Sequence, residues 1–128
     1  MKHNLKLILP NKKYVHSFAK GLNELRGEKN MQARSILKIF KQEKDFEALN
    51  KKMIESRKGV NLAKGIVPQT VYWVMSGKKF VGILKLRHYL NANLLQHGGH
   101  IGYVIIPSER RKGYGTAMLK VGLQKAKK

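Results

Sequence analysis

The sequence lacks cysteine altogether, and it has no run of 18 apolar residues. The first absence excludes disulfides, thiolate metal sites and a cysteine nucleophile, and the sequence predicts no metal site of another kind. The second absence predicts that no helix spans a membrane, because a span needs about 20 consecutive apolar residues. The first residues also lack the long apolar stretch of a secretory signal peptide. We therefore expect a cytoplasmic protein.

Carboxylates are scarce, because seven aspartates and glutamates stand against 27 lysines and arginines, for a formal net charge of +20. From residue 56 onward, Glu109 is the only acid beside 14 basic residues. A field of this sign attracts polyanions such as nucleic acid, acidic membrane or phosphorylated small molecules, without specificity. The simpler interpretation is a lysine-rich, solvated surface. Both interpretations stay open at this point.

The apolar pattern predicts one α/β domain over residues 1–128, which is an ordinary domain length. We expect strands at residues 6–9, 70–75, 80–86 and 101–106, from their β-branched and aromatic content. We expect helices at residues 12–25 and 114–125, and one or two further helices within residues 36–54, from their apolar periodicity. A hairpin turn is predicted at residues 76–79, and Asp45 is expected to cap the helix that follows it.

The strongest functional pattern lies in the last quarter of the chain, where a strand, a basic loop with glycines and an amphipathic helix follow one another. Gly113 and Gly115 let the backbone approach a ligand closely and adopt positive φ angles. Amides at a helix N-terminus have no intrahelical partners, and the helix dipole adds partial positive charge there. Arg110, Arg111 and Lys112 add full charges beside it. Together these features predict a cradle for phosphate or pyrophosphate.

Two commoner glycine loops do not fit this segment. The string Gly-x-x-x-x-Gly-Lys-Ser/Thr of a Walker loop does not occur. A dinucleotide fingerprint requires a third glycine, and Met118 stands where that glycine would fall. A basic turn that merely contains glycine is the simpler structural alternative.

Residues 110–115 resemble the Gln/Arg-x-x-Gly-x-Gly/Ala motif of GNAT N-acetyltransferases, and the apolar strand and Pro107 before them stand where that family has them. The likeness extends backward to further segments, which resemble a bacterial subgroup of predicted acetyltransferases: Trp73, the hairpin at Gly77, and residues 81–83, 86–91 and 98–103. It covers roughly residues 4–128. The resemblance implies the GNAT fold, an α+β mixed sheet, and acetyl-CoA as co-substrate.

The resemblance also implies roles for individual residues. The strand before the loop would pair its backbone with the pantetheine arm, at Val104, Ile105 and Ile106. Loop amides would bind the pyrophosphate, and these belong to Arg111, Lys112, Gly113, Tyr114, Gly115 and Thr116. Arg110 fills the first position of the motif. The reaction would be direct attack of an amine on the thioester, which needs a base for the amine and a proton donor for the thiolate.

The catalytic groups depart from the family pattern. In the family, further strands and a helix follow the cofactor helix, and a tyrosine of that later helix is often the general acid. Because the sequence ends at Lys128, we expect these strands, the helix and the acid to be absent from this chain, and we expect little or no acetyl transfer by it. No carboxylate falls in a predicted substrate-facing strand. His88, His97 and His100 have a suitable intrinsic pKa for a base, although a structural or exposed role is the more ordinary interpretation.

The expected acceptor is an amine of a small molecule or a protein, and the predicted substrate loops at residues 30–35 and 59–68 do not identify it. We also expect a homo-oligomer, because a missing strand would leave a sheet edge open and one flank of the last helix uncovered. That flank carries Met118, Leu119, Val121 and Leu123.

The alternative function is that of a small basic nucleic-acid-binding protein. In that case Tyr72, Trp73 and Phe80 would be aromatic platforms on which bases stack. Their alternation along two strands also fits ordinary packing on the two faces of a sheet. The structure distinguishes these interpretations through the burial of the rings.

Overall fold

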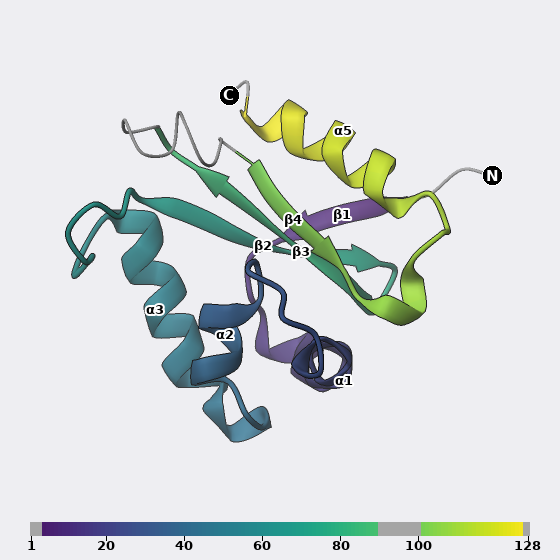
Figure 1. The fold of residues 1–128 in the computed structure, drawn as a ribbon, viewed down its shortest axis with the longest axis horizontal. Coiled ribbons are helices and arrows are strands. Elements are labelled where there is room, and N and C mark those ends of the chain that lie inside the picture. The colour runs from purple at the N-terminus through teal and green to yellow at the C-terminus, as the bar shows by residue number, and fades with distance from the viewer. Residues whose placement is uncertain (1–3, 90–100, 127–128) are drawn as a thin grey trace.

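The computed structural model describes residues 4–89 and 101–126, which form a four-stranded sheet with helices on both faces (Figure 1). The elements are β1 Leu5–Ile8, α1 Val15–Arg26, α2 Arg34–Ile39, α3 Phe46–Lys58, β2 Gln69–Ser76, β3 Lys79–Arg87, β4 Ile101–Ile105 and α5 Tyr114–Ala126. Short 3₁₀ turns precede α1, α3 and the loop before α5, at Lys12–Tyr14, Glu43–Asp45 and Pro107–Glu109. Every predicted strand and helix is confirmed, with small differences in the bounds. None of the helices in the described ranges is long and apolar enough to cross a membrane.

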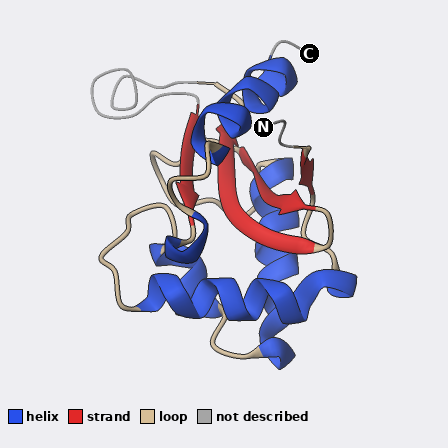
Figure 2. Ribbon diagram, turned by 90° about the vertical axis from the view of Figure 1, so that its right-hand side faces the viewer, coloured by secondary structure: helices blue, strands red, loops and turns tan. Residues whose placement is uncertain are grey.

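The strands pair antiparallel in the order β1-β2-β3-β4. The predicted hairpin joins β2 to β3 through two residues, the first of which is Gly77 with φ of 62°. Residues other than glycine rarely adopt a positive φ of this size. Helices α1, α2 and α3 cover one face of the sheet and α5 covers the other, as Figures 1 and 2 show.

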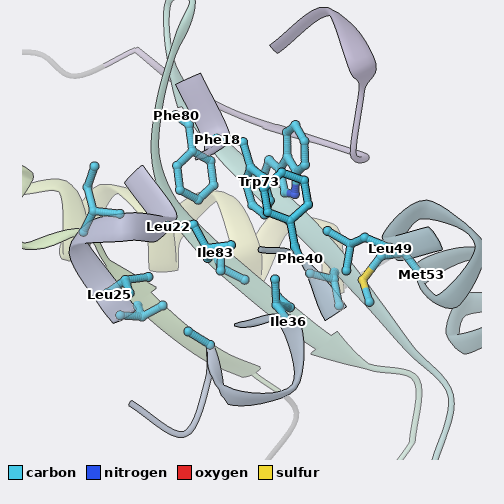
Figure 3. Packing of buried hydrophobic residues seen from close by; sticks show 14 of the residues in the cluster. Phe18, Leu22, Leu25, Ile36, Phe40, Leu49, Met53, Trp73, Phe80 and Ile83 are labelled. Carbon is cyan, nitrogen blue, oxygen red and sulfur yellow. The ribbon is translucent and has the colours of Figure 1, made fainter. Parts of the chain in front are cut away.

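Trp73 lies at the centre of the core between the sheet and the first three helices. Its ring stacks on Phe18 of α1, with centroids 4.1 Å apart and planes within 9°. Phe40 and Phe80 pack edge-on against Phe18 at 5.0 and 4.9 Å (Figure 3). At most 1% of each of these four residues is exposed. Trp73 and Phe80 therefore cannot stack on nucleobases, and their ordinary packing in the sheet is confirmed.

A second, smaller cluster fills the space between α5 and the sheet. Met118 of α5 is fully buried there against residues of all four strands, namely Leu5, Val74, Val81, Leu84 and Ile105. The helix approaches closely, because a Cβ added at Gly122 would lie 2.8 Å from Leu84. The expectation of an uncovered helix flank was thus wrong for Met118, since the helix lies across β1 as well as β3 and β4. Leu119 and Val121 are half-buried and Leu123 is 54% exposed, so assembly of copies stays a prediction.

Asp45 occupies the N-cap position of α3 as expected, but its side chain does not cap that helix. Its Oδ2 accepts hydrogen bonds from the backbone amides of Lys41 and Gln42, at 2.9 and 3.0 Å, and it makes no side-chain cap to the helix. The 3₁₀ turn that inserts before α3 places the carboxylate behind the helix start. Those two amides hold the pKa of Asp45 below its ordinary value.

Replacing Trp73 with alanine should lower the free energy of unfolding by about 3–5 kcal/mol, because it leaves a cavity in the middle of the aromatic core. Urea unfolding followed by circular dichroism measures the loss. Leu123→Ala is the control, since an exposed side chain should change stability by less than about 0.5 kcal/mol. Equal effects of the two substitutions would contradict the packing.

Candidate functional site

The backbone of β4 offers hydrogen-bonding groups along the edge that faces away from β3. The amide of Ile106 donates to the carbonyl of Val81 at 3.0 Å, and Val104 lies opposite Ile83 in the same register. Because hydrogen-bonded positions alternate in an antiparallel pair, Val104 and Ile106 direct their backbone groups toward β3. Tyr103 and Ile105 direct theirs toward the other edge, where no described strand pairs with β4.

This register shows which of the residues expected to pair with a pantetheine arm direct their backbone groups outward. Of Val104, Ile105 and Ile106, only Ile105 faces the outer edge, and the sequence analysis did not assign that role to Tyr103. The side chain of Ile106 is 1% exposed and belongs to the core. The sequence alone predicts that backbone groups alternate between the two edges of a strand. Which residues face outward depends on the register with β3, which the sequence does not give.

Arg110 shapes the loop between β4 and α5. Its guanidinium binds both carboxylate oxygens of Glu28, at 2.7 and 2.8 Å, and its Nε donates to the carbonyl of Ile105 at 3.0 Å. The hydrogen bonds from Arg110 lower the pKa of Glu28. The first residue of the motif is therefore engaged with the protein itself, and it fixes where the loop leaves the strand.

Two more carboxylates hold the same loop. Glu24 of α1 accepts hydrogen bonds from the backbone amide and the hydroxyl of Ser108, at 2.7 and 2.8 Å. Glu109 is 3% exposed and accepts from Lys112 at 2.9 Å and Lys79 at 3.2 Å. Burial alone would raise the pKa of Glu109, but the hydrogen bonds from these two lysines outweigh it, so the pKa is lowered.

Arg111 is the basic residue of the loop that remains available to a ligand. It is exposed and makes no hydrogen bond or ion pair with the described parts of the protein. Its φ of 66° and the 81° of Gly113 turn the loop so that α5 begins at Tyr114. Helix geometry leaves the amides of the first turn of α5, such as those of Gly115 and Thr116, without intrahelical acceptors.

A hollow of about 420 Å³ lies between the strand edge and this loop. Its lining includes seven of the ten predicted cofactor residues: Val104, Ile105, Arg110, Arg111, Gly113, Tyr114 and Gly115. Tyr103 and Glu109 also line it, whereas Ile106, Lys112 and Thr116 do not. A Cβ at Gly115 would meet only Tyr103, at an ordinary contact distance of 3.9 Å. Alanine would therefore fit at position 115 without a clash. Its methyl group would take up space in the hollow that the glycine leaves open.

His88 is the one candidate base among the described residues, and it does not line this hollow. Nε2 of His88 lies 2.9 Å from the hydroxyl of Thr70, so this ring has a structural partner. His97 and His100 lie outside the described residues. The carboxylate that borders the hollow, Glu109, is held by two lysines and is not a suitable base at neutral pH.

Lys85 is an unusual residue that the sequence analysis did not single out. It lies on β3 opposite Gly102, is 8% exposed, and borders a second hollow of about 220 Å³. Burial, together with the neighbouring charge of Arg87, lowers its pKa to about 8. The sequence did indicate this burial, because residues two positions apart on a strand share a face. Lys85 follows Ile83 by two residues and therefore lies on the face that packs into the core.

A strand edge lies beside a cationic, amide-rich loop, an arrangement whose geometry suits an extended ligand that carries phosphate. The chain belongs to the acetyltransferase (GNAT) family, because the family's model matches residues 33–128. This confirms the resemblance that the loop motif indicated.

The fold is also similar to that of a solved acetyltransferase. The crystal structure of the Microcin C7 self immunity acetyltransferase MccE, in complex with acetyl-CoA and AMP, matches with a TM-score of 0.55 and 14% sequence identity. The match covers 97% of this chain and 63% of that chain, so the present chain spans less than two thirds of its neighbour. A likeness at this identity confirms the fold. No curated protein matches the sequence.

Lys85→Met should raise the free energy of unfolding at pH 7, because the folded state no longer buries an ammonium group. The folded-state pKa of about 8 lies below the ordinary 10.5. Between these values the unfolded chain binds more protons, so the stability of the native sequence rises with pH. The advantage of the variant should therefore shrink by about 3 kcal/mol between pH 7 and 10.5. Urea unfolding of both proteins across this range measures it, and a constant advantage would contradict the burial.

Proposed function

We propose that this protein binds acetyl-CoA and transfers the acetyl group to an amine. The observation that carries the proposal is the hollow of about 420 Å³, where the outer edge of β4 meets the loop that opens α5. Membership of the acetyltransferase family and the acetyl-CoA in the MccE structure support the same conclusion.

In this proposal the two ends of the hollow bind different parts of the cofactor. The pyrophosphate binds the amides between Arg111 and Thr116, and the charge of Arg111 strengthens those contacts. The pantetheine arm lies along β4 and pairs with the outward backbone groups of Tyr103 and Ile105. The carbonyl of Ile105 already accepts from Arg110, so the amide of Ile105 and both groups of Tyr103 are the ones available to the arm.

The proposed reaction forms a bond between the acceptor nitrogen and the acetyl carbon and breaks the bond from that carbon to sulfur. The amine loses a proton, and the departing thiolate of CoA gains one. His88, His97 and His100 stay the proposed candidates for the base. The hydrogen bond between His88 and Thr70 makes His88 the weakest of them, because it ties the ring to a structural partner.

Nucleic-acid binding receives no support from the described site. Of the three aromatic rings that such a function would use, Trp73 and Phe80 are in the core, and Tyr72 is half-buried against the cluster under α5. The net charge of +20 favours weak, salt-dependent association with any polyanion, and CoA is itself a polyanion.

Gly113→Val should abolish CoA binding, because valine rarely adopts a φ of 81° and its side chain would occupy space beside the phosphates. Arg111→Ala should weaken binding by about 1.5–3 kcal/mol through loss of a charge-assisted contact. Calorimetry with CoA on folded variants measures both effects. Lys51→Ala, which removes one charge from α3, is the control and should bind CoA as the native protein does. Unchanged affinity in Gly113→Val would reject the assigned loop.

Acetyl transfer itself is tested by release of free CoA thiol from acetyl-CoA in the presence of mixed small amines. We expect release that requires an amine and that disappears in Gly113→Val. Tight CoA binding without any amine-dependent release would retain the cofactor site and reject the catalytic half of the proposal. Release that survives Gly113→Val would place the chemistry elsewhere.

A further inference from the structure

The hollow at Lys85 combines a buried cation with a lack of acidic partners. Lys85 is 8% exposed, yet its ammonium makes no hydrogen bond or ion pair with the described residues. Every buried side-chain nitrogen and oxygen in the described ranges has a hydrogen-bond partner, so this nitrogen is not sealed within the core and borders the hollow. An ammonium held in a buried place without a counter-charge is unfavourable for folding.

The rest of the lining complements a small anion. Arg87 supplies a second cation, Gln32 and Gln69 supply amide groups, and the lining contains no aspartate or glutamate. Lysine and arginine with side-chain amides are the donors that recognise carboxylate and phosphate. A volume of about 220 Å³ suits an anionic group with the atoms next to it, since whole drug-sized ligands need roughly 300–1,000 Å³.

The mouth of this hollow is apolar. Met31 and Ile66 line it and are 82% and 56% exposed, which is high for such side chains. Both belong to loops that meet over the sheet, one after α1 and one after α3. The loop after α1 is held in shape by Asn30, whose side chain accepts from the amide of Gln32 at 2.9 Å. A ligand that places its charge on Lys85 therefore presents its remaining atoms to an apolar rim.

The hollow adjoins the end of β4 that lies away from the cofactor loop. Lys85 is opposite Gly102 in the register, so the two residues share a face of the sheet. Gln32 covers Gly102 closely, because a Cβ there would lie 2.5 Å from Oε1 of Gln32. From Ile105 to Gly102 the strand advances by roughly 10 Å. A pantetheine arm that follows β4 from the loop thus runs toward the residue beside which Lys85 lies.

We propose that the Lys85 hollow binds the anionic group of the acetyl acceptor, so that the acceptor is a small amine that also carries a carboxylate or a phosphate. This inference rests on the proposed acetyl transfer and adds the substrate class. Lys85 and Arg87 hold the acid, the rim at Met31 and Ile66 contacts the carbon skeleton, and the amine points toward the thioester end of the arm. The acceptor sites expected from the sequence, at residues 30–35 and 59–68, supply this rim.

The first arm of the test measures amine-dependent thiol release with matched pairs of amines. Leucine is compared with leucinamide for a carboxylate, and O-phosphoethanolamine with ethanolamine for a phosphate. We expect a lower KM for the acidic member of at least one pair, and the pair that shows it identifies the acid. Lys85→Met should raise that KM roughly tenfold or more and leave the KM of the neutral member unchanged. Lys51→Met, which removes an exposed charge from α3, should change neither value.

The second arm does not depend on turnover. Side-chain NMR of Lys85 is followed while inorganic phosphate or acetate is added, with Lys51→Met as the background control. A bound anion should raise the pKa of Lys85, because it stabilises the ammonium form. Arg87 is the other charged residue of the lining, and Arg87→Gln should weaken the effect.

The outcomes separate the two proposals. Loss of CoA binding or of all thiol release, with a normal response of Lys85 to anions, rejects acetyl transfer and keeps the anion site. Equal KM values within both pairs, or a pKa of Lys85 that no anion changes, reject the acidic acceptor. An acetyl group found by mass spectrometry on Lys85 itself, without an added amine, would also overturn it, because the lysine would then be the acceptor.

Discussion

Arg110 connects three parts of the molecule that are distant in the sequence. Its guanidinium binds Glu28, which lies 82 residues earlier, and the carbonyl of Ile105 at the end of β4. The position of Glu28 depends on α1, and α1 is held by the stacking of Phe18 on Trp73. The aromatic core therefore determines where the loop between β4 and α5 leaves the sheet, through one planar side chain with fixed donor geometry.

The few carboxylates of this basic chain are concentrated where they order the loop. Glu24, Glu28 and Glu109 each accept two hydrogen bonds from side chains or amides in or near it. They neutralise Arg110 and Lys112 locally and leave Arg111 to act on a ligand. The general field of +20 attracts any polyanion, whereas this arrangement gives one place with defined geometry. The same contrast applies to Lys85, which is distinguished by burial and not by charge alone.

Most of the fold, including the order of strand, loop and helix in the last quarter of the chain, could be predicted from the sequence, because it depends on local patterns. β-Branched and aromatic content predicted the strands, apolar periodicity predicted the helices, and Gly113 and Gly115 after Arg110 indicated a loop suited to phosphate. What failed depends on distant partners. The contacts of Glu24 and Glu28 require α1 to meet the loop, and the outward direction of Tyr103 requires the register with β3. The side chain of Asp45 does not cap α3, because the 3₁₀ turn before the helix competes for it. Lys85 was missed because a lysine in an apolar strand is ordinarily expected to point toward solvent.

The contact between Arg110 and Ile105 has a further consequence for the solubility of the protein. An exposed strand edge invites addition of a strand from another molecule, which begins aggregation. Here the carbonyl of Ile105 is occupied by the guanidinium, and the chain turns away at Pro107 immediately afterwards. A strand from another molecule could form only a few hydrogen bonds here, because the carbonyl of Ile105 is already bound and the positively charged Arg110 lies beside it. The side chain that fixes the loop thus also reduces the number of backbone groups that this part of the edge offers to another strand.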